Sequence, residues 1–320
     1  MKTMLVLSMG ALLLAGTLSA QTPVPEWQAG VDKMKSLIQT NPAQASEEVG
    51  ELLKGKNKKN VDLVTSVAHV YLDAGKLTEA QEYLAMAKKA DNKDPKVSVL
   101  EGDIALAQKN IGQACQLYEQ AIYFDPNCKE AYLKYAQAYK SASPALAIEK
   151  LEQLKAVDPN CLEADRELAE VYYSSNRFGK AAEMYAKFID TPLATEDDML
   201  KYAFALFLNH DFEKSLQVAQ KGLQKNARHA AFNRLVMYNN TDLKRYEDAE
   251  KAAHAFFNAS DRADYSYLDY RYYGALLSAL KKYDEAIIEY GKALEKDGTQ
   301  VDLWREISDA HEMNNNYAEA

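Results

Sequence analysis

A period of 34 residues runs through most of this 320-residue chain and constrains its fold more than any other feature. Asp125-Pro126 and Asp158-Pro159 close two successive segments in which alanine and large apolar residues recur in the same order. Extended in both directions, the period predicts eight repeats, the last incomplete. Their starts are Val61, Pro95, Lys129, Leu162, Glu196, Ala230, Tyr267 and Val301. Repetition at such a period indicates structural units that stack on their neighbours.

Two positions of the repeat hold small residues. Position 8 is small in every repeat except the one with Met237, and position 20 is small throughout, as at Ala114, Ala181 and Ala286. Small side chains at this spacing allow two helices to approach closely, and larger apolar residues fill the remaining volume. Because the residue before a proline avoids the helical region, the Asp-Pro pairs are expected to end the second helix. The pattern therefore predicts two packed helices in each repeat.

Tyrosine recurs at position 11 (Tyr71, Tyr139 and Tyr172) and at position 24 (Tyr118, Tyr185 and Tyr290). The period, the small positions, these aromatic positions and the closing proline resemble the tetratricopeptide repeat. The resemblance covers residues 61–320 and implies an all-α fold, an α-solenoid of stacked helix-turn-helix units that forms a right-handed superhelix. Residues 21–60 are expected to form a divergent helical segment, with Trp27 and Leu37 as apolar anchors. The repeat from Ala230 departs most from the pattern, so we expect a local distortion there.

The first twenty residues have the pattern of a secretory signal peptide. Lys2 precedes an apolar stretch at 4–16, and small residues at 18–20 stand before Gln21. The stretch is too short to span a membrane stably, and no cysteine follows the expected cleavage site to carry a lipid. We therefore expect an exported bacterial protein, periplasmic or otherwise associated with the cell envelope, that has no transmembrane segment after cleavage and is soluble.

The charge pattern argues against a nucleic-acid partner. The formal net charge is −9, and the one dense basic cluster is the lysine-rich segment 54–59. A nucleic-acid-binding protein usually presents a broad basic face. We therefore interpret segment 54–59 as a solvated linker between helices.

No motif in the sequence indicates catalysis, a cofactor or a metal. The five histidines are scattered, and no phosphate-binding glycine loop or nucleophile motif occurs. Cys115, Cys128 and Cys161 have no C-x-x-C spacing, and their odd number leaves at least one unpaired in a monomer. We expect a protein that is not an enzyme, with small buried thiols.

The resemblance implies that the first helix of each repeat lines a concave groove through positions 2, 5, 9 and 12. The predicted partner-binding residues there are Arg166, Arg234, Arg271 and Arg305 at position 5, Phe204 and Tyr238 at position 9, and Tyr173 and Phe207 at position 12. Guanidinium groups bind carboxylates bidentately and aromatic faces cover apolar groups, so an acidic and apolar peptide or protein is the expected partner. Alternatively, the arginines pair with nearby carboxylates such as Glu163, Glu167 and Asp197, and the aromatic residues pack between repeats.

These observations predict a non-catalytic scaffold or peptide-binding adaptor in the cell envelope. Two alternatives remain open. The repeats could dock substrates for a longer envelope enzyme, or they could bind glycan or peptidoglycan with Tyr173, Phe204 and Phe207 as stacking platforms.

The last repeat breaks off early. We expect its first helix at 301–313, with Trp304 at a packing position, a turn at 314–316, and the start of a second helix at 317–320. Because a repeat cannot bury its apolar face alone, we expect the chain to continue beyond Ala320. We also expect that removing this incomplete repeat leaves the melting temperature of residues 61–300 almost unchanged.

Overall fold

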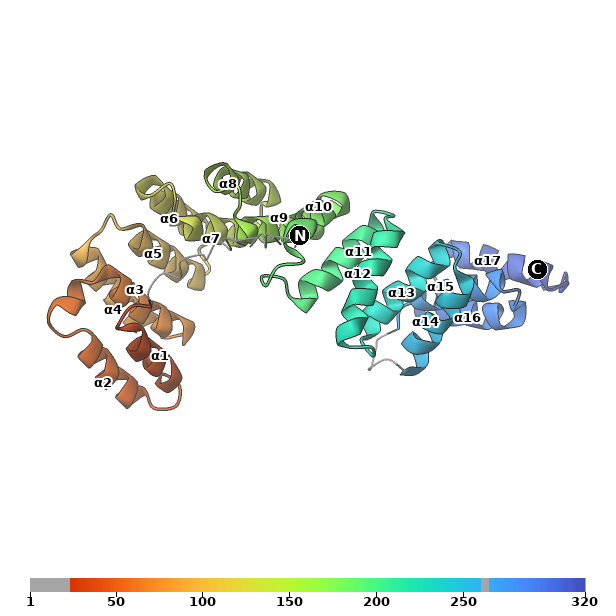
Figure 1. Cartoon of the computed structure of the whole chain (residues 1–320), viewed down its shortest axis with the longest axis horizontal. Helices are drawn as coiled ribbons and strands as arrows, with labels where there is room; N and C mark the ends of the chain where they lie inside the picture. Colours follow the sequence, from red (N-terminus) through yellow and green to blue (C-terminus); the bar gives the residue numbers. More distant parts are fainter. Residues whose placement is uncertain (1–23, 260–264, 320) are drawn as a thin grey trace, which may run out of the picture. The chain divides into compact units, whose positions relative to one another are not determined.

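The computed structural model describes residues 24–259 and 265–319, so the expected signal peptide lies outside the described part of the chain. Within these ranges the chain folds into α-helices joined by short turns, without a β-strand (Figure 1). The predicted all-α solenoid fold is confirmed. The helices belong to two compact bodies, which we call the N-terminal body, up to Asn92, and the C-terminal body, from Lys93.

The N-terminal body contains two helix pairs. Its elements are α1 (Gln28–Leu37), α2 (Pro42–Leu52), the 3-10 helix η1 (Gly55–Lys59), α3 (Val61–Asp73) and α4 (Leu77–Ala90). Val31 and Met34 are the buried residues of α1, whereas the expected anchors Trp27 and Leu37 are only half-buried. The lysine-rich segment forms η1, whose residues are exposed.

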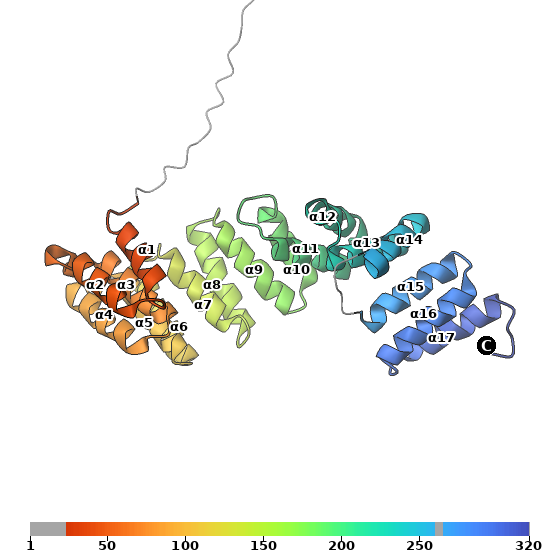
Figure 2. The same ribbon diagram turned by 90° about the horizontal axis from the view of Figure 1, so that it is seen from below.

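The C-terminal body continues the helix pairs. Its elements are α5 (Pro95–Ala107), α6 (Ile111–Phe124), α7 (Lys129–Tyr139), α8 (Pro144–Val157), α9 (Leu162–Ser174), α10 (Phe178–Phe188), α11 (Glu196–Leu208), α12 (Phe212–Lys225), α13 (Ala230–Asp242), α14 (Tyr246–His254), the π-helical turn η2 (Ala255–Ala259), α15 (Tyr267–Ala279), α16 (Tyr283–Lys296) and α17 (Val301–Met313). From α3 onward, each odd-numbered helix begins at a repeat start read from the period. Consecutive helices pack together, as α15, α16 and α17 do in Figure 2. We call the odd-numbered helices of this body the first-helix layer.

Turn chemistry separates the two helices of each repeat. Except in the repeat from Lys129, the first helix of each repeat is followed by a residue in the left-handed region, such as Lys109 (φ 62°), Asn176 (φ 57°) or His210 (φ 62°). At Lys109 and its equivalents, the next amide donates to a carbonyl five residues back, which closes the helix end. After the first of these turns in the C-terminal body, the side chain of Asn110 caps α6.

The small positions lie in the helix interfaces, as predicted. Ala114, Ala181 and Ala286 are fully buried. At position 8 of the last complete repeat, a Cβ added to Gly274 would lie 2.7 Å from the ring of Tyr290. An atom there has no room beside a ring that is itself buried, so glycine sets how closely α15 and α16 approach.

The repeat from Ala230 contains a distortion, as expected. Its second helix, α14, is short and passes into the π-helical turn η2. Met237 is buried at the small position, and Asn239 and Asn240 are buried beside it. The amide of Asn239 donates to the Ser215 hydroxyl and to the Leu235 carbonyl, both at 2.8 Å.

The last helix, α17, packs on α16. Leu303 and Ala310 are buried in one cluster with Ala286 and Tyr290, whereas Trp304, expected to pack, is 62% exposed. Residues 317–319 form turns rather than the start of a helix. α17 thus covers part of the preceding repeat, and the effect of its removal on the melting temperature stays a prediction.

The variant Leu303→Ala is therefore expected to lower the free energy of unfolding by about 2–4 kcal/mol, because it leaves a cavity at a fully buried site. Urea denaturation of the full chain measures this change. Trp304→Ala, one residue away on the exposed face, should cost less than about 1 kcal/mol. Equal losses for the two variants would show that α17 does not dock in this orientation.

The three cysteines are free thiols; Cys115 and Cys161 are buried and Cys128 is half-buried. Burial raises the pKa of Cys115 to about 11 and also raises the pKa of Cys128 and Cys161. Since the thiolate is the reactive form, Cys115 should alkylate at least about 100-fold more slowly with iodoacetamide at pH 8 in the folded chain than in urea. Mass spectrometry of time points measures the rates, and fast labelling of Cys115 in the folded chain would contradict the packing of α6.

Candidate functional site

Three of the four predicted arginines form ion pairs with the next repeat. Arg166 Nε donates to Asp198 Oδ1 at 3.0 Å, and Asp198 is 1% exposed. Its other carboxylate oxygen accepts from the backbone amide and the hydroxyl of Thr195, at 2.8 and 2.6 Å. Asp198 thus completes the capping box of α11, whose N-cap residue is Thr195, and is also the partner of an arginine on α9.

Arg234 and Asp269 repeat this arrangement in a more buried setting. The guanidinium of Arg234 donates to both carboxylate oxygens of Asp269, at 2.7 and 3.1 Å. Asp269 is fully buried and also accepts from the Tyr238 hydroxyl and from Ser266, which caps α15. Burial, together with the neighbouring Asp269 carboxylate, raises the pKa of Tyr238. A charge placed in such an enclosed site needs its partner, so this pair joins α13 to α15.

Arg271 pairs with Glu306 of α17. Its Nε and terminal nitrogen donate to the carboxylate at 3.0 and 2.6 Å, and the hydrogen bond from Arg271 to Glu306 is the main cause of its raised pKa. Arg305 is the exception: it is 71% exposed and lies 3.5 Å from Asp302 on its own helix. The alternative that the arginines are structural holds for Arg166, Arg234 and Arg271, although their partners are Asp198, Asp269 and Glu306 rather than the carboxylates expected from the sequence.

Two of the four predicted aromatic residues are part of the core. Phe207 is 8% exposed and Tyr238 is 2% exposed, so neither presents a free face to a partner. Their rings lie 5.6 Å apart, and Tyr238 stacks on Tyr272 with the centroids 4.0 Å apart. Phe204 and Tyr173 are half-buried, and the Tyr173 ring meets Phe178 edge to face at 5.7 Å. Among the four predicted aromatic residues, only Phe204 and Tyr173 are partly exposed on the first-helix layer.

A pocket of about 320 Å³ lies among these residues. Thr241 and Asp242 of α13, Leu268, Arg271, Tyr272 and Ala275 of α15, and Glu306 of α17 line it. Three successive first helices therefore contribute to one cavity. It combines apolar walls with a few polar groups, which is the usual composition of a binding site.

Asp242 and Tyr272 are two polar residues of this pocket that the sequence pattern does not predict. The Tyr272 hydroxyl donates to Asp242 Oδ2 at 2.9 Å. Desolvation in the pocket raises the pKa of the Asp242 carboxyl, partly offset by this hydrogen bond and by nearby His210. Burial raises the pKa of Tyr272 as well. The two residues occupy positions 13 and 6 of their repeats, outside the positions that the resemblance assigns to the groove.

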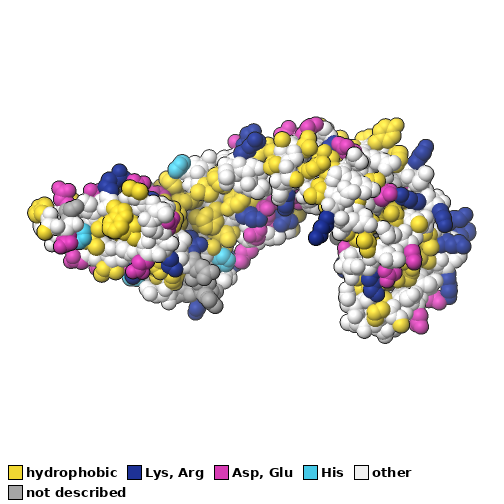
Figure 3. All heavy atoms as spheres, turned by 180° about the vertical axis from the view of Figure 1, so that it is seen from behind, with side chains coloured by type: hydrophobic (Ala, Val, Ile, Leu, Met, Phe, Trp, Pro, Cys, Tyr) yellow, Lys and Arg dark blue, Asp and Glu magenta, His cyan; other side chains and the backbone are white. Residues whose placement is uncertain are grey.

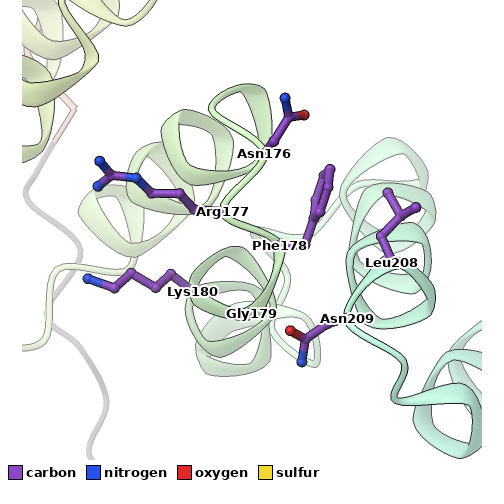
Figure 4. Close-up of a pocket in the computed structure, with 7 residues that line it drawn as sticks. All are labelled: Asn176, Arg177, Phe178, Gly179, Lys180, Leu208 and Asn209. Atoms are coloured by element: carbon purple, nitrogen blue, oxygen red, sulfur yellow. The ribbon is translucent and has the colours of Figure 1, made fainter.

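A larger cavity of about 510 Å³ lies at the turn between α9 and α10, beside the end of α11. Phe178 and Leu208 face each other across it, while the side chains of Arg177 and Lys180 point away from Leu208 (Figure 4). The cations therefore do not converge on the cavity. We place the candidate site instead at the 320 Å³ pocket, where side chains from three repeats meet.

The surface of the C-terminal body carries charges of both signs. Figure 3 shows acidic and basic side chains interspersed with apolar ones on the face that it presents. Many of these charges pair across one repeat, as Lys129 does with Glu163 and Lys201 with Glu170. In the described ranges, no three His, Cys, Asp or Glu side chains are arranged to hold a metal ion. None of the described helices has the length and apolar character that a membrane span requires.

Comparison with known proteins supports the repeat assignment. Residues 67–127 and 136–193 match the family model described as tetratricopeptide repeat. The solved structure of Pseudomonas aeruginosa pilF has a TM-score of 0.51 at 15% identity, over 65% of this chain and 96% of that chain. A tetratricopeptide repeat protein from Parabacteroides merdae ATCC 43184 has a TM-score of 0.46 at 15% identity, over 78% of this chain and 98% of that one.

YrrB, described as a tetratricopeptide repeat protein with an unusual peptide-binding site, has a TM-score of 0.44 at 15% identity, over 57% of this chain and 94% of that chain. The curated proteins contain no match. The family match falls on helix pairs with the predicted period and with small residues buried between the helices. This chain therefore contains tetratricopeptide repeats, matched over residues 67–127 and 136–193.

Proposed function

We propose that this protein is a non-catalytic interaction scaffold that binds an extended peptide segment of a protein partner along the first-helix layer of its C-terminal body. The 320 Å³ pocket is the observation that carries the proposal, because three successive repeats build it from side chains of the same layer. Stacked repeats commonly use such a continuous surface for recognition. Binding across several repeats also suits an extended ligand better than a compact one.

The proposed contact residues differ from the sequence-based set. Tyr173 and Phe204 offer partly exposed aromatic surface, and the pocket adds Leu268 and Ala275. We therefore propose that the partner contributes apolar residues to the contact. The expectation of acidic residues in the partner depended on unpaired arginines. Arg166, Arg234 and Arg271 instead pair with carboxylates of this chain, as described above. In this proposal those three arginines hold neighbouring repeats in register.

Site-specific photocrosslinking tests the proposed surface. A benzoylphenylalanine at position 268, in the pocket, should form an adduct with the partner in cells that produce the protein. The same group at Gln220, exposed on α12, the second helix of its repeat, is the matched control and should form none. Adducts are identified by mass spectrometry after denaturing purification. Adducts from position 220 alone, or equally from both positions, would contradict binding on the first-helix layer.

We also propose that the scaffold acts after export, in a bacterial cell envelope. Lys2, the apolar stretch at 4–16 and the small residues at 18–20 support this location. Fractionation of the crosslinking cells, with mass spectrometry of the N-terminal peptide, tests it. A mature chain that begins at Gln21 in the envelope fraction is the expected result, and an uncleaved chain in the cytoplasm would contradict it.

A further inference from the structure

The pocket on the first-helix layer contains a carboxylate, Asp242, that has no counter-charge within residues 24–259 and 265–319. Among the described residues, Asp242 accepts a hydrogen bond from the Tyr272 hydroxyl and forms no ion pair. Its neighbour Arg245 is bound to Glu213 of the preceding repeat. This contrasts with Asp198 and Asp269, each of which pairs with an arginine. Asp242 is therefore available to a cation from outside the chain.

The arginine in the pocket cannot neutralise Asp242 without losing its own partner. Arg271 makes three hydrogen bonds to the carboxylate of Glu306, at 2.6, 3.0 and 3.2 Å. A bidentate pair of this kind is among the stronger polar contacts in proteins. With Arg271 and Glu306 balanced, the net charge of the pocket is that of Asp242.

The walls of the pocket suit a long side chain with a charged end. Leu268 and Ala275 provide apolar contact for methylene groups. The Tyr272 ring is held between its stacking contact with Tyr238 and its hydrogen bond to Asp242. Lysine and arginine combine an apolar stem with a cationic head, and aromatic rings attract such cations.

The net negative charge of the C-terminal body also favours a cationic ligand. The whole formal net charge of −9 lies in residues 93–320, because residues 1–92 contain equal numbers of basic and acidic residues. A body with this excess of acidic residues attracts cationic segments of a partner as the two molecules approach each other. The attraction weakens as salt is added.

We propose that this pocket binds a lysine or arginine side chain of the partner peptide, with Asp242 as its counter-charge. The inference rests on the proposed function, since it names the residue that the partner places in the same site. The apolar stem lies against Leu268 and Ala275, and the cationic head lies between the Asp242 carboxylate and the edge of Tyr272.

Fluorescence anisotropy with defined peptides tests the proposal. The probes are fluorescein-labelled nine-residue peptides of alanine and serine with lysine, arginine, norleucine or glutamate at the centre. The lysine and arginine peptides should bind the full chain about fivefold more tightly than the norleucine peptide at low salt. The glutamate peptide should bind most weakly.

Two matched variants identify the carboxylate responsible. Asp242→Asn should remove the preference for lysine over norleucine while leaving norleucine binding unchanged. Glu285→Gln, which removes one charge from the exposed side of α16, should leave the preference intact. Because Asp242 is exposed, we expect its variant to fold, and circular dichroism checks this.

Equal binding of the four peptides, or a preference for lysine that survives Asp242→Asn, would overturn the inference. Either result leaves the proposed function standing if crosslinking at position 268 succeeds. Failure of crosslinking at position 268 would instead count against the proposed function itself. No binding of the lysine peptide to the unmodified chain would also overturn the inference.

Discussion

Replacing Arg234 with alanine should lower the free energy of unfolding by about 3–5 kcal/mol, because it leaves the Asp269 carboxylate buried without its cation. Asp269 is fully buried and would keep only the hydrogen bonds from Tyr238 and Ser266. Urea denaturation of the full chain followed by circular dichroism measures the loss. Hydrogen exchange should show faster opening in α13 and α15, the two helices that the pair joins.

The chain offers a matched control at the same position of another repeat. Arg305 is 71% exposed and lies 3.5 Å from an exposed carboxylate, so Arg305→Ala should cost less than about 1 kcal/mol. The double variant Arg234→Met with Asp269→Asn should recover much of the loss, since it removes the unpaired charge. Similar losses for the two single arginine variants would show that the Arg234–Asp269 pair does not join the repeats. A binding assay on Arg234→Ala alone would mix lost stability with lost affinity.

Replacing Gly274 with leucine should lower the free energy of unfolding by about 3 kcal/mol, because the new side chain has no space against Tyr290. The first added carbon alone would lie 2.7 Å from the ring, and Tyr290 is only 3% exposed. The helices α15 and α16 must therefore separate, or the ring must leave its site. Urea denaturation measures the loss, and near-ultraviolet circular dichroism reports the tyrosine environment.

Gly291 on α16 is the control for this substitution. A Cβ added there meets no atom within 4 Å, so Gly291→Leu should leave stability unchanged or raise it by up to about 1 kcal/mol through helix propensity. The two variants introduce the same side chain into adjacent helices of one repeat. If both variants destabilised the chain equally, close approach at position 8 would not explain the small residues there.

The predicted positions of the helices follow from local and short-range rules. Alanine at position 20 and a small residue at position 8 act within one helix pair, a short distance along the chain. Their burial, and the first helices that begin at Val61, Pro95 and Tyr267, could therefore be predicted from spacing alone. The repeat position predicts that Trp304 is packed, yet the buried residue is its neighbour Leu303, which lies on another face of the helix.

The candidate site was predicted less well, since it depends on contacts between repeats. Arg234 and Asp269 are 35 residues apart, and nothing in the sequence shows that the arginine turns toward the next capping residue rather than toward a ligand. Tyr238 occupies a position assigned to the groove, yet it is buried beneath Tyr272. Asp242 carries no sequence signal beyond being one of many exposed carboxylates.

The sequence by itself determined the period, the helix pairs and the small residues between them, because these depend on helical spacing and side-chain volume within one repeat. Only the tertiary structure decided which arginines are already paired, and where a pocket forms around a carboxylate that has no ion pair in the described part of the chain. Those outcomes depend on how one repeat is rotated against the next, which brings together side chains about one period apart.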